Sequence, residues 1–169
     1  MSETSKTILS THACSEIDRW LTRYPADQKR SGVLQALTIV QEENGGWLTE
    51  ELIEAVADYL EMPRIAVYEV VSFYTMYNVK PAGQHIINVC TNISCMLNGA
   101  EKIVDHLKKR LEIDINQTTA DGKFTLREVE CLAACAGAPM FQIGKKYYEN
   151  LTLEKVDVIL REMEPLCGK

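Results

Sequence analysis

Four cysteines in the second half of the chain are the residues whose type and spacing predict chemistry. Cys90 and Cys95 form a C-x4-C pair, Cys131 and Cys135 form a C-x3-C pair, and 35 residues separate the two pairs. Each pair follows a strand-like run of residues, so we expect each pair to lie in a loop at the end of a strand. Four thiolates that converge from two loops can hold either a [2Fe–2S] cluster or a tetrahedral zinc ion.

Three kinds of site compete for this pattern. A thiol–disulfide enzyme typically uses C-x-x-C at the start of a helix, and neither pair has that spacing. Structural zinc sites often use closer C-x2-C pairs, although a wider spacing occurs. A [2Fe–2S] cluster contains two irons that each take two thiolates, so its ligands divide naturally into two pairs. The spacing therefore favours the cluster and leaves the zinc site as the alternative.

The residues around the cysteines are compatible with a cluster. Small residues, which let backbone N–H groups approach sulfur atoms, accompany the second pair: Ala133, Ala134, Ala136, Gly137 and Ala138. Four apolar side chains are expected to exclude water from the centre: Ile93, Met96, Leu97 and Leu132. Glu130 directly precedes a candidate ligand, and we expect its negative charge to hold the reduction potential low.

The other candidate ligands do not extend the set. Cys14 falls in line with Ile17 and Leu21 on one face of a predicted helix, so it is interpreted as a small buried apolar residue. Cys167 lies in the C-terminal tail. The histidines form no ligand pair with a cysteine, which argues against a Rieske centre; they are His12, His85 and His106.

The composition limits the possible partners. The formal net charge is -6 and the pI is about 5.1, which argues against nucleic acid or an anionic membrane surface as a partner. No apolar run approaches the roughly 18 residues of a membrane span, and the N-terminus lacks a secretory or transit signal. We therefore expect a soluble protein of the cytosol or of a mitochondrial matrix.

The sequence also lacks the features of an independent enzyme. It contains neither G-x-G-x-x-G nor G-x-x-x-x-G-K-[ST], so no nucleotide site is predicted. No catalytic residue is assigned. A cluster alone transfers single electrons and does not select a substrate, which indicates a relay subunit that works beside a catalytic partner.

The elements that position the cysteines follow from periodicity and capping signals. We expect residues 1–10 to be disordered and residues 11–79 to form a helical bundle, in which Thr49 caps a helix. The break at 80–83 (KPAG) marks the start of a second domain, 80–169. There, strands are predicted at 85–90, 124–129 and 140–143. Asn98 and Glu101 resemble a capping box, and Thr152 is expected to cap the last helix.

The predicted order of the second domain is β-α-β-β-α. This order fits a thioredoxin-like layer of helices on a small sheet, so the whole chain is assigned to the α+β class.

At these residues the chain resembles the 24 kDa iron–sulfur subunit of NADH:quinone oxidoreductase, respiratory complex I. The segments that carry the resemblance are NGGWLTEELIEAVADYL, VVSFYTMYNVKPAG, HIINVCTNISCML, DGKFTLREVECLAACAGAPM and KYYENLT. The resemblance implies a helical bundle followed by a thioredoxin-like [2Fe–2S] ferredoxin domain. It also implies that Cys90 and Cys95 ligate one iron and that Cys131 and Cys135 ligate the other.

The family further implies a role and a location. The chain would be a non-catalytic electron-transfer subunit that docks on the flavoprotein subunit, which binds FMN and NADH, within the iron–sulfur peripheral arm of the complex. It would lie at the inner face of the inner membrane, on the cytoplasmic side or, in an organelle, on the matrix side. Related modules serve NAD-linked hydrogenases and formate dehydrogenases, and these remain the alternative.

One residue departs from the pattern of the family. The family usually has E-C-L-G-A-C, whereas Ala133 replaces the glycine in this chain. If that position has a positive φ, alanine is strained there, and the stability or potential of the centre is affected.

Overall fold

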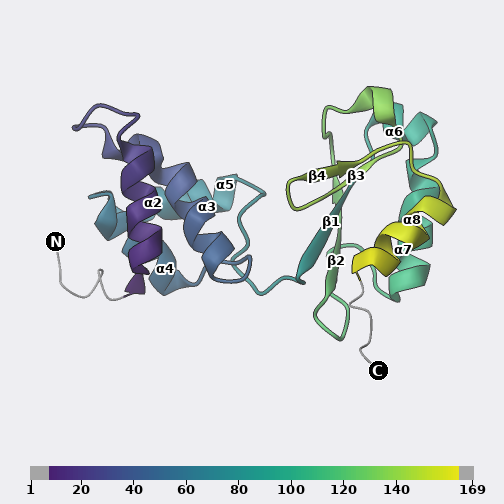
Figure 1. Ribbon diagram of the computed structural model, residues 1–169, viewed down its shortest axis with the longest axis horizontal. Helices are drawn as coiled ribbons and strands as arrows, with labels where there is room; N and C mark the ends of the chain where they lie inside the picture. Colours follow the sequence, from purple (N-terminus) through teal and green to yellow (C-terminus); the bar gives the residue numbers. More distant parts are fainter. Residues whose placement is uncertain (1–7, 164–169) are drawn as a thin grey trace. The chain divides into compact units, whose positions relative to one another are not determined.

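The computed structural model describes residues 8–163 (Figure 1). The chain divides between Pro81 and Ala82 into two compact units. The helices of the first unit are α2 (Thr11–Leu21), the 3-10 helix η1 (Lys29–Gly32), α3 (Val33–Glu43), α4 (Glu50–Tyr59) and α5 (Arg64–Phe73). The elements of the second unit are β1 (His85–Cys90), α6 (Ile93–Leu97), α7 (Ala100–Leu111), β2 (Phe124–Val129), the 3-10 helix η2 (Cys135–Gly137), β3 (Phe141–Ile143), β4 (Lys146–Tyr148) and α8 (Leu153–Met163). Over residues 8–163, no helix is long and apolar enough to cross a membrane.

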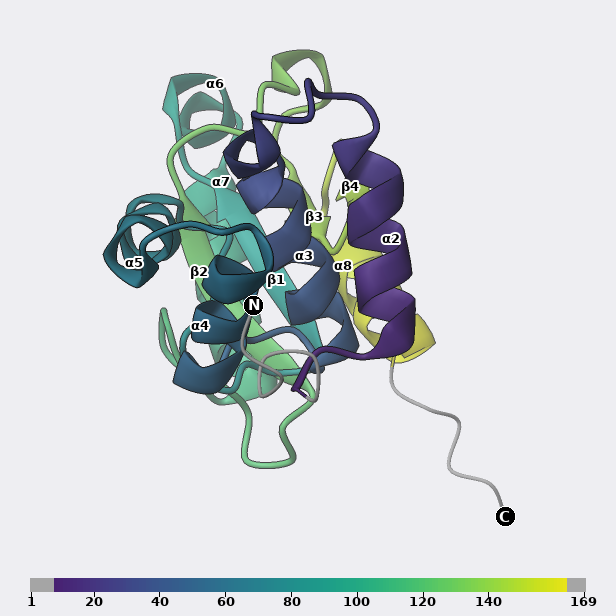
Figure 2. The ribbon, with the colours of Figure 1, turned by 90° about the vertical axis from the view of Figure 1, so that its left-hand side faces the viewer.

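The helices of the first unit share one hydrophobic core. Helices α2 and α3 run side by side (Figures 1 and 2). The predicted cap of α4 is confirmed, because the Thr49 hydroxyl accepts a hydrogen bond from the Leu52 N–H at 3.2 Å. Such caps satisfy a backbone donor that has no partner inside the helix. The largest fully buried side chains of this core are Ile17, Leu37, Leu48, Ile53, Val56 and Leu60.

The ordered part of the first unit begins before residue 11. Leu9 is buried, and the Ser10 hydroxyl accepts a hydrogen bond from the Ala13 N–H at 2.8 Å, which caps α2. Ser10 also donates to the Glu43 carboxylate at 2.7 Å. Residues 8–10 therefore differ from the predicted disordered segment 1–10, whose first seven residues lie outside the described part. The polar sequence did not reveal that one leucine supplies an anchor and one serine a cap.

The second unit contains a four-stranded mixed sheet with the strand order β2-β1-β3-β4. Strand β1 pairs parallel with β2 and antiparallel with β3, and β3 pairs antiparallel with β4. Helices α7 and α8 lie on the same side of the sheet (Figure 1), and both contribute to its core. The predicted strands at 85–90 and 124–129 are confirmed at both ends. Buried core residues from the sheet include Ile87, Val89, Phe124, Leu126 and Phe141.

Parallel pairing of β1 with β2 brings distant parts of the chain to one edge of the sheet. The register runs from His85 opposite Phe124 to Cys90 opposite Val129. Because parallel strands end at the same edge, the loop after β1 and the loop after β2 emerge together. Cys90 is the last residue of β1, and Cys131 follows the end of β2 by two residues. This pairing positions both halves of the candidate site.

The predicted capping box at Asn98 is wrong. The Asn98 side chain donates to the Ser94 carbonyl at 2.7 Å and so closes α6, a short helix that the sequence analysis did not predict. Helix α7 begins after Gly99, which has φ +91° and provides no side-chain cap. The tight turn between the two helices needs a left-handed residue, and glycine adopts that conformation without steric cost. By contrast, the predicted Thr152 cap of α8 is confirmed by the hydrogen bond from the Lys155 N–H at 3.2 Å.

Candidate metal centre

The four cysteines of the two spaced pairs line a single cavity of about 30 Å³. The complete lining consists of Cys90, Asn92, Ser94, Cys95, Cys131, Ala133, Ala134 and Cys135. The structure therefore brings together all four thiols that the sequence analysis selected. Within residues 8–163, no three His, Cys, Asp or Glu side chains lie close enough together to hold a single ion.

The first cysteine pair is buried. Cys90 is 5% exposed and Cys95 is 2% exposed. The backbone N–H of Cys90 donates to the Met140 carbonyl at 3.2 Å, and its thiol donates to the Glu130 carbonyl at 3.7 Å. Cys95 is held by α6, which Asn92 caps through a 2.7 Å hydrogen bond from the Ile93 N–H. Strand pairing on one side and a capped helix on the other thus fix this pair.

The second cysteine pair is exposed. Cys131 and Cys135 both lie at the surface of the chain, in the segment between β2 and β3. The backbone N–H of Ala133 donates to the Cys131 sulfur at 3.3 Å. The Ala133 N–H thus places a backbone donor on the exposed pair, whereas the first pair is shielded from water.

Burial changes the acidity of one thiol in the first pair. Desolvation, followed by the hydrogen bond with the Cys90 thiol, raises the pKa of Cys95 from the usual 9.0 to about 11. At pH 8, a rise of this size lowers the thiolate fraction by roughly a hundredfold. In the metal-free folded protein we therefore expect iodoacetamide to alkylate Cys95 much more slowly than Cys131 or Cys135, as followed by mass spectrometry. In denaturant the difference should disappear, and equal rates in the folded protein would contradict the assignment.

The raised pKa of Cys95 also determines how the stability of the metal-free chain changes with pH. The folded-state pKa of Cys95 lies above the unfolded value, because burial favours the neutral thiol. Its contribution to stability is present below about pH 9 and is lost as the pH rises towards about 11. Chemical denaturation of the metal-free chain across this pH range measures the decrease in the free energy of unfolding. The Cys95→Ala variant should show a smaller decrease.

The apolar residues of α6 do not shield the cavity within this chain. Ile93, Met96 and Leu97 are 66%, 55% and 76% exposed, so the prediction that they exclude water is wrong for the chain by itself. Hydrophobic character alone did not show which side of a five-residue helix faces inwards. Leu132 is partly buried and packs against the small cluster that contains both buried cysteines and Met140, as predicted.

The remaining candidate ligands lie elsewhere. Cys14 is partly buried against the core of the first unit, in agreement with its interpretation as an apolar residue. Cys167 lies outside the described residues. His12 contacts Glu43, His85 lies beside the Phe124 ring, and His106 contacts Asp157.

Three residues at the centre were not identified from the sequence. Asn92 and Ser94 line the cavity, and Met140 supplies a carbonyl to the first cysteine. A signal for Asn92 was present, because asparagine directly before an apolar run is a typical N-cap. The role of Met140 depends on a pairing between distant segments and left no local signal.

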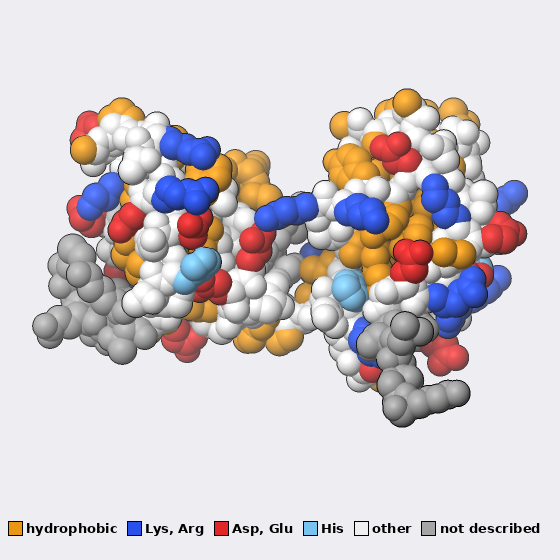
Figure 3. Space-filling view, viewed as in Figure 1, with side chains coloured by type: hydrophobic (Ala, Val, Ile, Leu, Met, Phe, Trp, Pro, Cys, Tyr) orange, Lys and Arg blue, Asp and Glu red, His pale blue; other side chains and the backbone are white. Residues whose placement is uncertain are grey.

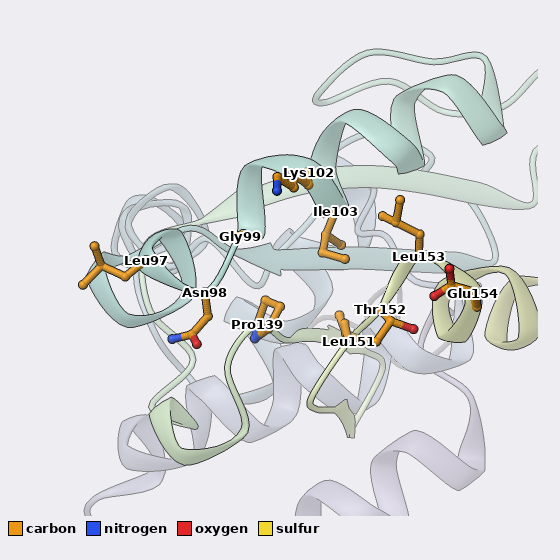
Figure 4. Close-up of a pocket in the computed structure, with 10 residues that line it drawn as sticks. All are labelled: Leu97, Asn98, Gly99, Lys102, Ile103, Pro139, Leu151, Thr152, Leu153 and Glu154. Atoms are coloured by element: carbon orange, nitrogen blue, oxygen red, sulfur yellow. The ribbon is translucent and has the colours of Figure 1, made fainter.

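A second, larger cavity of about 450 Å³ lies between α6, α7 and the start of α8 (Figure 4). Apolar side chains such as Leu97, Ile103 and Leu151 contribute to its lining, together with Lys102 and Glu154. Its lining contains no cysteine, and its Thr152 hydroxyl caps α8 and is a hydrogen-bond partner of the Glu154 carboxylate. On the face shown in Figure 3, positive and negative side chains are interspersed on each unit. The cysteine cavity is therefore the candidate functional site.

The donor set at this cavity fits a [2Fe–2S] group. Thiolates are its usual ligands. The four thiols are supplied as two pairs, one from the end of β1 and α6, and the other from the segment between β2 and β3. A hydrogen bond from the Ala133 N–H to the Cys131 sulfur is the kind of contact that stabilises a ligated thiolate. The residues present would thus hold such a group through Cys90, Cys95, Cys131 and Cys135.

Comparisons with known proteins agree with this geometry. Residues 17–164 match the family model described as thioredoxin-like [2Fe-2S] ferredoxin. The E subunit of the NADH-quinone oxidoreductase of Rickettsia bellii (strain RML369-C) is 46% identical over 143 residues, which cover 85% of this chain and 86% of the relative. NADH dehydrogenase [ubiquinone] flavoprotein 2, mitochondrial, of Dictyostelium discoideum is 40% identical over 137 residues, which cover 81% of this chain and 56% of the relative.

A solved structure supports the fold. The NAD+-reducing [NiFe]-hydrogenase in its H2-reduced state has a chain that matches 78% of this chain with a TM-score of 0.67. The match covers 22% of that chain at 17% sequence identity, so the likeness concerns the fold alone. The four-stranded mixed sheet, the four thiols on one cavity and the match over residues 17–164 lead to one conclusion: the chain belongs to the thioredoxin-like [2Fe-2S] ferredoxin family.

Proposed function

We propose that this chain is the electron-transfer subunit of an NADH-quinone oxidoreductase and holds one [2Fe–2S] cluster. Cys90 and Cys95 ligate one iron, and Cys131 and Cys135 ligate the other. The observation that carries the proposal is that all four thiols line one cavity in a chain of this family. The 46% identity to the Rickettsia bellii relative supports the assignment to this complex rather than to a hydrogenase, whose likeness is one of fold.

The chain's own residues hold and tune the site. A [2Fe–2S] cluster supplies one-electron transfer when it is bound. The buried Cys90 and Cys95 keep water away from one side, while the exposed Cys131 and Cys135 face the surface that a redox partner can approach. The Met140 carbonyl accepts a hydrogen bond from the Cys90 N–H and holds the backbone of this ligand in place.

The proposal extends to a partner and a location, and the similarity to complex I subunits supports both. The chain docks on the flavoprotein subunit that binds FMN and NADH, within the iron–sulfur peripheral arm. It acts as a non-catalytic electron-transfer subunit, and the substrate binds on the partner. The complex places it at the inner face of the inner membrane, on the cytoplasmic or matrix side. Over the described residues, 8–81 form the helical unit and 82–163 form the unit that carries the four candidate ligands.

Metal analysis tests the central claim. Protein purified without oxygen should contain iron and acid-labile sulfide in equal amounts and absorb between about 400 and 600 nm. Dithionite should bleach this absorption and produce a rhombic EPR signal at low temperature. A colourless protein with bound zinc and no sulfide would overturn the proposal in favour of a structural zinc site.

Co-purification with quinone oxidoreductase subunits, rather than with hydrogenase subunits, tests the choice of complex.

The charge of Glu130 should affect the reduction potential. A carboxylate about 10 Å from the centre, at an effective dielectric constant near 20, changes the potential by about 70 mV. Glu130 is exposed, so solvent screening reduces this value. We expect Glu130→Gln to raise the midpoint potential by less than this amount, and the shift should shrink at high salt. Redox titration followed by EPR measures it.

Glu128 provides the matched control for this prediction. It carries the same charge, is also exposed and lies two residues earlier on β2. Two strand residues add about 6.6 Å of separation along the chain. Glu128→Gln should therefore shift the potential less than Glu130→Gln. A lower or unchanged potential in Glu130→Gln would show that this carboxylate does not act on the site.

A further inference from the structure

The two faces of the four-stranded sheet are covered differently. Helices α7 and α8 both lie on one face, and its side chains form the core of the second unit (Figure 1). Ile87, Leu126 and Ile143 belong to this core and are paired directly across β1, β2 and β3. Successive strand residues point to opposite faces, so the residues between them lie on the other face. Over residues 82–163 that face carries no layer of helices, and we call it the open face.

A row of four polar side chains crosses the open face. Arg127 of β2 is paired with Asn88 of β1. Asn88 is also paired with Gln142 of β3, and Gln142 is paired with Tyr147 of β4. Arg127, Asn88 and Gln142 are partly buried, whereas Tyr147 is exposed. The row therefore presents a guanidinium, two amides and a phenol hydroxyl on four adjacent strands.

The guanidinium of Arg127 lacks a counter-charge within residues 8–163. It has neither a hydrogen bond nor an ion pair with any of these residues. Glu128 is its neighbour in sequence but points to the opposite face. Partial burial lowers the pKa of Arg127, because water is removed and no carboxylate takes its place. Arginine nevertheless stays protonated in proteins, so a partly desolvated cation is left unpaired on the open face.

The row also lies close to the candidate metal centre. Cys90 is on the same strand and the same face as Asn88, two residues further along β1. Two strand residues correspond to about 6.6 Å. Cys90 lines the cysteine cavity. A protein segment that covers the row would therefore lie beside the centre.

We propose that the open face is a docking surface for the partner subunit and that Arg127 binds a carboxylate of that subunit. The proposal rests on the proposed function, which supplies the partner. The planar guanidinium presents a fork of N–H donors that matches the two oxygens of a carboxylate. Charge complementarity selects an acidic segment, because a basic segment would be repelled and an apolar one would leave the cation buried without a partner. The amides of Asn88 and Gln142 can hydrogen-bond the backbone of the same segment.

Binding measurements test this surface. The full chain, loaded with iron and sulfide, is titrated against the purified FMN-binding subunit of the complex. We expect Arg127→Gln to raise the dissociation constant at least about tenfold, because it leaves a carboxylate unpaired in the interface. Arg127→Lys should give an intermediate constant, since lysine keeps the charge and lacks the fork.

Arg161 provides the matched control. It is an exposed arginine on α8, which packs on the covered face, and its Nε donates to the Asp157 carbonyl of the same helix at 3.1 Å. Arg161→Gln removes the same charge from the chain and should change the dissociation constant by less than about twofold. Equal effects of Arg127→Gln and Arg161→Gln would show that only the net charge matters and would overturn the proposal.

The stability of the chain by itself gives an independent measurement. Since Arg127 has no counter-charge within residues 8–163, Arg127→Gln should leave the urea midpoint of the loaded chain unchanged or raise it. Its iron and sulfide content should equal that of the parental chain. A lower midpoint would show that a partner within this chain already holds the guanidinium, which would contradict the proposal.

A double-mutant cycle identifies the group that Arg127 meets. Acidic residues on the subunit surface that this chain protects from hydrogen exchange are replaced one at a time by their amides. One replacement should weaken binding of the parental chain and leave binding of Arg127→Gln unchanged. If no replacement behaves in this way, Arg127 does not bind a carboxylate and the proposal is wrong.

The outcomes separate this proposal from the proposed function. If the parental chain does not bind the FMN-binding subunit, the proposed partner is incorrect and the docking surface fails with it. If the parental chain binds and Arg127→Gln binds equally well, only the docking surface fails. If the chain by itself is a dimer that Arg127→Gln dissociates, a second copy of the chain occupies the open face, and this result also overturns the proposal.

Discussion

The Cys95→Ala chain is expected to lose its ability to hold iron and sulfide. Cys95 is one of four thiols on one cavity and is 2% exposed, so its removal leaves the buried pair with a single thiolate. Changes in the outer shell of a metal site alone cost about 10–100-fold in affinity. We therefore expect loss of a ligand to lower the iron and sulfide content by at least about tenfold after reconstitution without oxygen.

The control for this variant is another cysteine of the same chain. Cys14→Ala removes a partly buried thiol from the first unit and should leave the iron content, the visible absorption and the EPR signal unchanged. Circular dichroism should show that both variants remain folded, because alanine replaces a side chain of similar size. If Cys95→Ala retains the full iron content while folded, the assigned ligand set is incorrect.

Phe141→Ala should cause the largest loss of stability in the second unit. Phe141 is fully buried on β3, between β1 and β4, and its ring lies 5.4 Å from that of Tyr148. Truncating a buried phenylalanine costs about 3–5 kcal/mol through lost transfer free energy and the cavity that remains. Urea denaturation followed by circular dichroism should show this loss as a lower transition midpoint.

Tyr147 offers a matched comparison for Phe141. It is an aromatic residue on the neighbouring strand β4, and it is 45% exposed. Tyr147→Ala should change the free energy of unfolding by no more than about 0.5 kcal/mol. Phe141→Ala should also weaken retention of the metal, because the adjacent Met140 carbonyl holds the Cys90 backbone. An equal effect of the two variants would show that β3 is not the centre of this core.

Much of the second unit was predictable because its signals are local. The run HIINVC and the run from Phe124 to Val129 are strand-like in composition, and both strands have the predicted limits. Hydroxyl caps such as Thr49 and Thr152 were identified for the same reason. The four thiols were selected by type and spacing, and the structure places them on one cavity.

The parts that could not be predicted depend on distant or very short elements. Helix α6 has five residues, which is too short to show a helical period, so Asn98 was assigned to the wrong helix. The parallel pairing of β1 with β2, which creates the site, joins segments that no local pattern connects. The positive φ of Ala133 could not be predicted, because an alanine in a sequence does not indicate a left-handed backbone.

The parallel pairing of β1 with β2 has a consequence for synthesis on the ribosome. Cys90 and Cys95 emerge before Cys131 and Cys135, so they have no second pair until β2 and the segment after it have been made. β3 must then be added beside β1 before the Met140 carbonyl can hold Cys90. Non-local pairing of this kind forms late, since loop closure comes before its contacts. A nascent chain therefore carries unpaired thiols from the synthesis of Cys90 until β3 has been made, and metal must be delivered after that point.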